Sequence, residues 1–462
     1  MKKHPNILMI IVDQQRYDCI GYSKNYPVHT PNLDKLASDG IWFSNAFSHL
    51  PVCGPSRQSL MNGRRPEEIG CLWNFNNGLK ICALEPSEYS WPRELKAVNY
   101  QSGYIGKWGV HPKVDPTHYG YDQYIDEKQY NHFQKENYPD VTFKQSYFGE
   151  DNPIPVEKSQ THWTAQKTMG MIREFTRNSE PWHIRVNFSE PHLPCRPSKP
   201  FSDLYDPKEI PIWRNFNDDF LNKPYIQKQQ LYNWEIEHFT WDDWAPIVAR
   251  YYGIISQVDE AIGRILATLD ELELAEDTIV IYTSDHGDMC GGHRMLDKHY
   301  VLYDEVVKVP FIIRWPRMIK SKQICNHFVY NFLDLPPTIL EWLKIDVPDF
   351  FVGQSLVPLI NNTSPNWRTE VVSTYNGQQF GLYTQRMIRN HDWKYIWNTT
   401  DVDELYFLKE DPYELVNQIY ESAFSNIVSD LREKLYLRLH SEGDGLVENE
   451  WMKTQLLQGR KL

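Results

Sequence analysis

The sequence predicts an α/β protein in which a large, mixed and mainly parallel sheet is flanked by helices. Two apolar runs, at residues 5–13 and 278–283, have the length and β-branched content of buried strands. Residues 245–273 show helical periodicity directly before the second run. A helix followed by a buried strand is typical of parallel sheets that helices cover on both faces.

The other elements follow from local patterns. A Pro-Asn-Leu-Asp start predicts a helix from Pro31 to about residue 39. Patterns between residues 56 and 219 predict a helix over 56–62, strands over 100–105 and 182–188, and a long ordered loop over 194–219. We therefore expect one large domain over residues 1–370.

After about residue 370 the pattern changes to short strand-like runs, at 386–389, 393–397 and 404–408, followed by a helix over 422–439. A turn of Asn and Asp residues separates the first two runs, as in an antiparallel hairpin. The sequence thus predicts a C-terminal subdomain over residues 371–462, with a small antiparallel sheet and a helix.

Composition narrows the class of protein. The net charge of −13 over 462 residues argues against nucleic-acid binding, because no overall basic field would attract phosphates.

The early apolar run 7–12 is too short to cross a bilayer and leads into Asp13 without a small-residue cleavage site. We expect no membrane span and a cytoplasmic protein, or a secreted or periplasmic one if a leader was removed. Aromatic residues make up 14%, which suits stacking on sugar rings, although core packing accounts for most of them.

The strongest motif is the segment CGPSR at residues 53–57, followed by Leu60 and Gly63. It resembles the sulfatase signature. The resemblance implies an alkaline phosphatase-like fold and a Cys53 oxidised to Cα-formylglycine by a formylglycine-generating or an anaerobic sulfatase-maturating enzyme. The aldehyde hydrate would attack sulfur, and deprotonation of its second hydroxyl would expel sulfate. Arg57 would hold this hydrate and help to neutralise the site.

Two strand ends carry the residues that the resemblance assigns to a metal. Asp13 and Gln14 follow the first strand, and Asp285 and His286 follow the second. Ligands of parallel sheets bind beyond such carboxyl ends. Together with the modified Cys53, these residues imply Ca²⁺, with Mg²⁺ as the alternative, because oxygen donors suit a hard cation. Gln14 stands where many members have Asp, and the Asp-His pair resembles iduronate-2-sulfatase-like members.

The segment GYIGKW at residues 103–108 resembles the second sulfatase signature, in which Lys107 would contact the sulfate. The usual form has a His two residues after this Lys, and here that position is Gly109. The nearest histidine is His111, followed by Pro112. The resemblance assigns the base that releases sulfate to His111, and a loop histidine near the surface is the alternative interpretation.

Two further residues complete the expected anion site. His192, in a Pro-His-x-Pro segment, would bind a sulfate oxygen or protonate the departing alcohol. Lys298 stands in the segment Leu-Asp-Lys that resembles the family's last sulfate-binding stretch. With Arg57 and Lys107 they form a small basic pocket in an acidic protein, which favours one specific anionic group.

The sequence therefore predicts a sulfate-ester hydrolase whose substrate is a sulfated saccharide, such as a glycosaminoglycan fragment. Aryl or steroid sulfates are the next option. A phosphonate monoester hydrolase or phosphodiesterase of the same fold, and a non-catalytic protein that binds sulfated glycans, are the rivals. The sequence leaves the oligomeric state open, between a monomer and a homo-oligomer.

Overall fold

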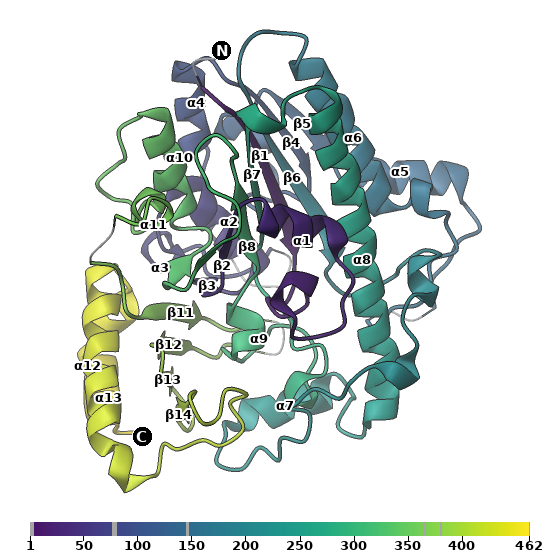
Figure 1. The fold of residues 1–462 in the computed structure, drawn as a ribbon. Coiled ribbons are helices and arrows are strands. Elements are labelled where there is room, and N and C mark those ends of the chain that lie inside the picture. The colour runs from purple at the N-terminus through teal and green to yellow at the C-terminus, as the bar shows by residue number, and fades with distance from the viewer. Residues whose placement is uncertain (1–3, 76–80, 145–146, 364–365, 379–380, 462) are drawn as a thin grey trace.

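A computed structural model describes residues 4–75, 81–144, 147–363, 366–378 and 381–461. Its centre is an eight-stranded sheet of order β5-β4-β6-β1-β7-β8-β2-β9 (Figure 1). The strands are β1 (Asn6–Asp13), β2 (Ile41–Phe43), β4 (Gln101–Gly106), β5 (Gln123–Asp126), β6 (Trp182–Pro191), β7 (Thr278–Ser284), β8 (Phe311–Arg314) and β9 (Gln323–Cys325). From β5 to β7 all neighbours are parallel, and only β8 runs antiparallel to both of its neighbours. The predicted mixed, mainly parallel sheet is confirmed.

Helices cover both faces of this sheet. Successive side chains of β1 point to opposite faces, and each face packs into its own apolar cluster. The face of Leu8 and Ile10 packs against α1 (Pro31–Ser38), α6 (Gln160–Phe175) and α8 (Trp241–Glu271). The face of Ile7 and Met9 packs against α2 (Cys53–Asn62), α10 (Leu335–Leu343) and α11 (Val357–Ile360). All eight residues of β1 are buried, which explains its continuous apolar sequence.

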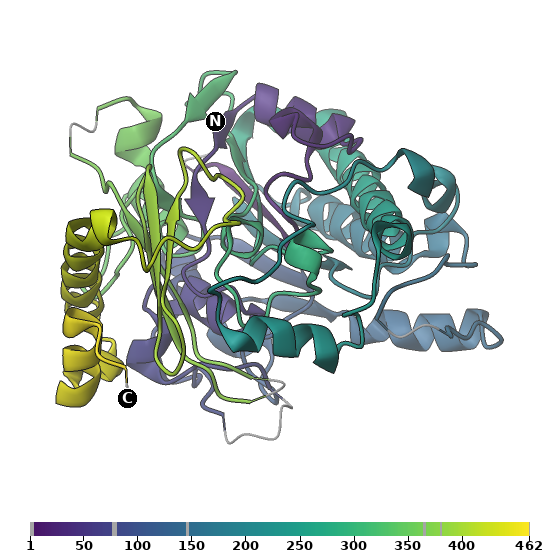
Figure 2. The same ribbon diagram turned by 90° about the horizontal axis from the view of Figure 1, so that it is seen from below.

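The C-terminal part forms a four-stranded antiparallel sheet of order β11-β12-β13-β14. Its strands are β11 (Val371–Tyr375), β12 (Gln385–Arg389), β13 (Trp393–Asn398) and β14 (Glu404–Phe407). Helices α12 (Ser425–Ser441) and α13 (Glu450–Gln458) pack on one face, and the other face turns towards the rest of the chain (Figure 2). The predicted antiparallel sheet with a helix is confirmed, with a second helix after it.

Strand β11 contacts the segment that leads to Cys53. The hydroxyl of Ser373 donates to the carbonyl oxygen of Ser48 at 2.6 Å, and the Thr374 amide donates to that of His49 at 2.9 Å. The first strand of the C-terminal sheet is therefore hydrogen-bonded to the backbone of the segment that precedes α2.

The remaining elements are short. They are β3 (Ala46–Phe47) paired with β10 (Val329–Tyr330), and the helices α3 (Pro66–Ile69), α4 (Glu94–Ala97), α5 (Lys128–Asn137), α7 (Tyr225–Asn233) and α9 (Asp304–Val307). Helix α2 begins at Cys53, before the start expected after Pro55, because a proline is tolerated in the first turn of a helix. Among the described residues, no helix is both long and apolar enough to span a membrane.

Candidate active site

The carboxyl ends of four parallel strands bring the predicted side chains to one edge of the sheet. Asp13 is the last residue of β1, Lys107 directly follows β4, His192 directly follows β6, and Asp285 directly follows β7. Cys53 faces this edge from the first turn of α2 and is only 4% exposed. The parallel topology thus assembles residues that are far apart in the sequence.

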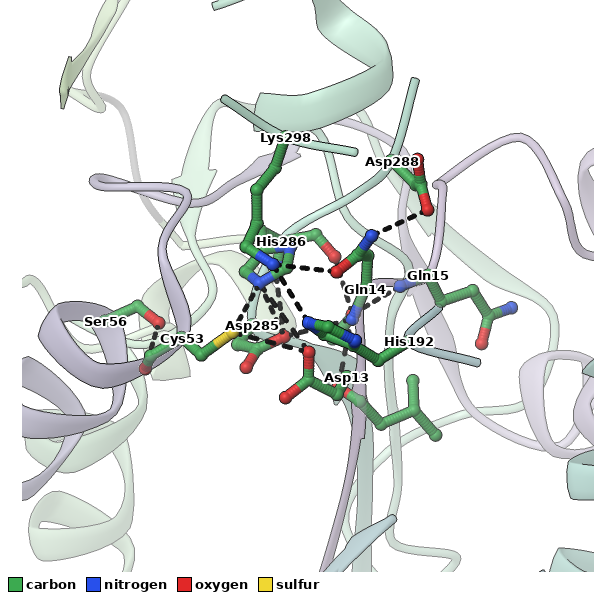
Figure 3. A network of polar contacts seen from close by, with 12 residues as sticks. Asp13, Gln14, Gln15, Cys53, Ser56, His192, Asp285, His286, Asp288 and Lys298 are labelled. Atoms are coloured by element: carbon green, nitrogen blue, oxygen red, sulfur yellow. Dashed lines mark hydrogen bonds and ion pairs between the residues drawn. The ribbon is translucent and has the colours of Figure 1, made fainter. Parts of the chain in front are cut away.

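Cys53 lies inside a buried group of ligand-type atoms. The ligand atoms of Asp13, Cys53, Asp285 and His286 all lie within 4.8 Å of one another. The Cys53 Sγ atom is 3.1 Å from His286 Nε2 and 3.5 Å from Asp13 Oδ1 (Figure 3). This spacing allows one ion to contact several of these residues at once.

Arg57, one turn after Cys53 in α2, ties the two strand-end carboxylates together. Its guanidinium donates to Asp285 Oδ2 at 2.9 Å and to Asp13 Oδ2 at 3.1 Å. A third bond reaches Asn187 Oδ1 at 2.9 Å. The side chains of Arg57 and both carboxylates are fully buried, so these charges stabilise one another without solvent screening.

Lys107, His192 and Lys298 complete the site, and Lys107 and His192 also line a cavity beside it. Lys107 Nζ is 2.6 Å from Asp13 Oδ2, and its side chain remains 23% exposed. Lys298 Nζ donates to His192 Nε2 at 3.0 Å. His192 Nδ1 lies 2.7 Å from the Leu193 carbonyl oxygen, which can only accept, so the Nδ1 atom carries the proton and Nε2 carries the lone pair.

The charges around Cys53 favour its thiolate. Burial and the Asp13 carboxylate would raise the pKa of Cys53, but Lys107, Lys298 and His286 outweigh them and hold this pKa well below its usual value. Burial also opposes ionisation of Asp13, yet the same cationic side of the site lowers the pKa of Asp13 well below its usual range. The cationic side chains therefore outweigh both burial and the neighbouring carboxylate at the Cys53 sulfur, although the chain as a whole is acidic.

His286 directs one ring nitrogen at the cluster. Its Nδ1 lies 2.9 Å from the Gly287 carbonyl oxygen and donates to it, so Nε2 faces Cys53 and the carboxylates. Burial lowers the pKa of His286, but Asp285 and Cys53 more than offset this and raise the pKa to about 9. A cation bound among these carboxylates would compete with that proton for Nε2.

The structure does not bring His111 to the cluster. Its Nδ1 accepts hydrogen bonds from the backbone amides of Lys113 and Val114, at 3.1 Å and 2.9 Å. The described residues show no hydrogen bond or ion pair between His111 and Cys53 or its neighbours. The backbone of Gly109, two residues before His111, adopts a left-handed conformation with φ +70°.

Several residues that hold the site were not identified from the sequence. Asn187 accepts from Arg57, and Asp288 and Asp297 accept from the side chain of Gln14. Asn187 had a detectable signal, because a lone amide in a buried strand needs a partner. The two aspartates lie in an irregular loop, where no periodicity marks a polar residue as buried.

A cavity of about 390 Å³ opens beside Lys107 and His192. Its wall is rich in amide and hydroxyl groups and contains two aromatic rings, and its lining residues include Tyr130, Asn131, Gln134, Phe143, Asn152, Glu190 and Gln257. Such a cavity has the size and chemistry of a small-molecule site.

Comparison with known proteins decides the family. The sulfatase family model matches residues 5–345, and the C-terminal model of N-sulphoglucosamine sulphohydrolase matches residues 291–440. The chain belongs to the sulfatase family. This sulfatase is 29% identical to an arylsulfatase of Clostridium perfringens, over 98% of each chain.

Solved structures agree with the alkaline phosphatase-like fold of this sulfatase. A structure in complex with its substrate D-glucosamine-2-N,6-O-disulfate superposes with a TM-score of 0.80 at 21% identity, over 97% of this chain and all of that one. A phosphonate monoester hydrolase of Agrobacterium radiobacter superposes with a TM-score of 0.81 at 25% identity, over 95% and 96%. The sulfatase is a sulfuric ester hydrolase, as the motifs predicted.

Proposed function

We propose that this sulfatase releases sulfate from a sulfated saccharide, using a formylglycine made from Cys53 and a divalent cation, Ca²⁺ before Mg²⁺. The observation that supports this most directly is the placement of Cys53 between a buried carboxylate pair and three cationic side chains, beside a polar cavity.

The residues present fit a hard divalent cation. Asp13 and Asp285 offer carboxylate oxygens, Gln14 offers an amide oxygen, and His286 offers Nε2. Oxygen donors suit Ca²⁺ and Mg²⁺, and the nitrogen of His286 is the one softer member. When bound there, the cation neutralises sulfate oxygens and activates the nucleophile. The formylglycine supplies a hydroxyl nucleophile whose sulfated product can break down, which a thiol cannot supply.

The chain's own cations bind and orient the sulfate group. The partly exposed Lys107 and the buried Lys298 both act on Cys53, and Arg57 holds Asp13 and Asp285 beside it. Fixed positive charges in a buried site stabilise the charge that develops on the sulfate oxygens. His192 Nε2 lies at the border between the sulfate site and the cavity, where the alcohol would leave.

A saccharide suits the cavity better than an aromatic or steroid substrate. Amide and hydroxyl side chains hydrogen-bond to sugar hydroxyls, and the rings of Tyr130 and Phe143 offer faces for a sugar ring. The Oε1 atom of Glu190 accepts from the hydroxyl of Thr161 at 3.1 Å, while its Oε2 has no hydrogen-bond partner within the described part of the chain. A free acceptor in this position suits a hydroxyl or amino group on the substrate.

A phosphodiester or phosphonate monoester is the rival substrate. The structural likeness to a phosphonate monoester hydrolase supports this alternative. Both esters share with a sulfate monoester a tetrahedral centre and a single negative charge. The positive charges of Arg57, Lys107 and Lys298 would suit either group. Reaction rates on the two kinds of ester therefore have to distinguish them.

The test is a comparison of kcat/KM on defined sulfated saccharides, an aryl sulfate and a matched aryl phosphodiester, each with and without a chelator. We expect sulfate release from a saccharide to be fastest and to be lost with the chelator. The mass of the Cys53 peptide, from protein purified from its own source, should show the aldehyde.

The matched control is a second cysteine. Cys53→Ala should abolish sulfate release, whereas Cys82→Ala, at an exposed thiol, should leave it unchanged. A large preference for the phosphodiester would overturn the proposed substrate. An unmodified Cys53 thiol together with tight binding of sulfated glycans would favour a binding protein.

A further inference from the structure

The side-chain amide of Gln14 is held at both ends. Its Nε2 donates to Asp288 Oδ2 at 2.7 Å and to Asp297 Oδ1 at 3.1 Å. Its Oε1 accepts from Lys298 Nζ at 2.8 Å. Figure 3 shows the nitrogen end directed at Asp288 and the oxygen end directed at Lys298.

Charge allows only this orientation of the amide. If the group were reversed, its oxygen would face two carboxylates and its NH₂ would face an ammonium group. Amide orientations are assigned from such networks, and here both ends agree. The oxygen therefore stays on the side of Lys298, whose ammonium group also acts on Cys53, while the backbone amide of Gln14 donates to Asp285 Oδ1 of the cluster at 3.2 Å.

The two aspartates are themselves fixed. Asp288 and Asp297 are 2% and 3% exposed. Asp288 Oδ1 accepts from the backbone amides of Cys290 and Asp297, at 2.8 Å and 3.1 Å, which leaves Oδ2 for Gln14. Asp297 Oδ2 lies 3.2 Å from His299 Nε2. Neither carboxylate can turn away from Gln14 without losing another bond.

We propose that Asp288 and Asp297 are positioning residues that direct Gln14 Oε1 at the cation of the active site. This inference rests on the proposed cation site. It also explains the residue type at position 14. An aspartate or glutamate there would stand against two buried carboxylates, and like charges at such distances are strongly unfavourable. Glutamine supplies the hydrogen-bond donor that Asp288 and Asp297 require. The negative charges then belong to these two aspartates, which contact Gln14, and not to residue 14 itself.

The test measures cation affinity, so it does not depend on turnover. Calcium titrations of the full chain, by calorimetry after chelator treatment, give the Kd. Asp288→Asn should weaken binding by about 10–100-fold, as expected when a residue that orients a metal ligand is changed. The matched control is Asp259→Asn, another buried aspartate, which caps α1 far from the cluster and should leave the Kd unchanged.

A double-mutant cycle separates positioning from simple loss of charge. If Asp288 acts only through its charge, Gln14→Glu should tighten calcium binding equally in the wild-type and Asp288→Asn backgrounds. If Asp288 positions Gln14, Gln14→Glu should weaken binding in the wild type and partly restore it in Asp288→Asn, with a coupling of about tenfold in Kd.

The outcomes distinguish this inference from the proposed function. Equal effects of Gln14→Glu in both backgrounds would overturn the positioning role alone. Failure of the wild-type protein to bind either calcium or magnesium would overturn the proposed cation site, and the inference with it. Thermal unfolding of each variant shows whether it is folded, and the cycle can be closed with Asp297→Asn where Asp288→Asn does not fold.

Discussion

A Cβ atom built on Gly109 would lie 3.1 Å from Cδ of Arg57. A side chain at position 109 would therefore contact Arg57 in the site, but glycine has no side chain. His111, two residues later, is engaged by backbone amides of its own loop. The contacts of His111 place it outside the cluster, in contrast to the role that the sequence motif suggested for it.

We accordingly expect His111→Ala to keep its turnover within about twofold of wild type, since removing a group outside the reacting atoms leaves the transition state unchanged. His192→Ala, at the border of the sulfate site, should lose about 100-fold or more in kcat. Accumulation of sulfated enzyme in His111→Ala, detected by intact mass after rapid quenching, would restore His111 as the releasing base.

Arg57 is the residue whose loss should damage both stability and activity. Arg57→Met leaves Asp13 and Asp285 buried without their shared partner, which we expect to cost about 3–5 kcal/mol of unfolding free energy. Arg173→Met removes an exposed ion pair with Glu271 and should cost less than about 1 kcal/mol. Urea unfolding of both variants makes the comparison. Similar losses would show that the Arg57 pairs contribute no more than a surface contact.

The cavity prediction concerns Glu190. Glu190→Ala removes the acceptor that we assign to a substrate hydroxyl or amino group, so kcat/KM for the best saccharide should fall by about tenfold relative to kcat/KM for an aryl sulfate. Deoxy analogues of that saccharide identify the hydroxyl, because one of them should lose activity with the wild type but not with the variant. Glu136→Ala, at an exposed position on α5, is the control. An unchanged ratio of the two kcat/KM values would remove Glu190 from substrate selection.

Asp259 gives a pH dependence of stability. Burial raises the pKa of Asp259 from 3.8 to about 6, although amides of Asn32 and Leu33 at the start of α1 donate to it. A raised folded-state pKa means that the folded protein binds this proton more tightly, so the contribution of Asp259 to stability is greatest below about pH 4 and is lost as the pH rises through 6.

This fall corresponds to about 3 kcal/mol, and Asp259→Asn should remove it because asparagine does not titrate. The measurement is the difference in unfolding free energy between about pH 4 and pH 7 for the variant and the wild type. The variant should be less stable overall, since it loses an acceptor for the α1 amides. An identical pH difference in both proteins would contradict the prediction.

The sheet and the ends of its strands were predictable because burial on both faces leaves a direct trace in the sequence. β1 and β7 read as continuous apolar runs, and a parallel arrangement then places Asp13 and Asp285 at one edge. The C-terminal hairpins were predictable for a similar reason, from short runs separated by turn residues.

The orientation of loop side chains was not predictable. Asp288 and Asp297 lie between β7 and α9 in a segment without periodicity. Gln14 adopts a φ of +71°, which its residue type does not predict. The position of His111 depends on the turn at Gly109. Each of these features arises from backbone dihedral angles and distant partners rather than from local propensity.

Strand β11 has a consequence for how this protein can vary. Its backbone and hydroxyl groups are bonded to Ser48 and His49, a few residues ahead of Cys53, and Tyr375 at its end contacts the ring of His299 beside Lys298. Replacing the C-terminal sheet with that of a relative would therefore change the contacts that support both Cys53 and Lys298. A substitution in β11 therefore bears on the surroundings of the site as well as on the stability of the C-terminal sheet, so the two parts of the chain are structurally coupled.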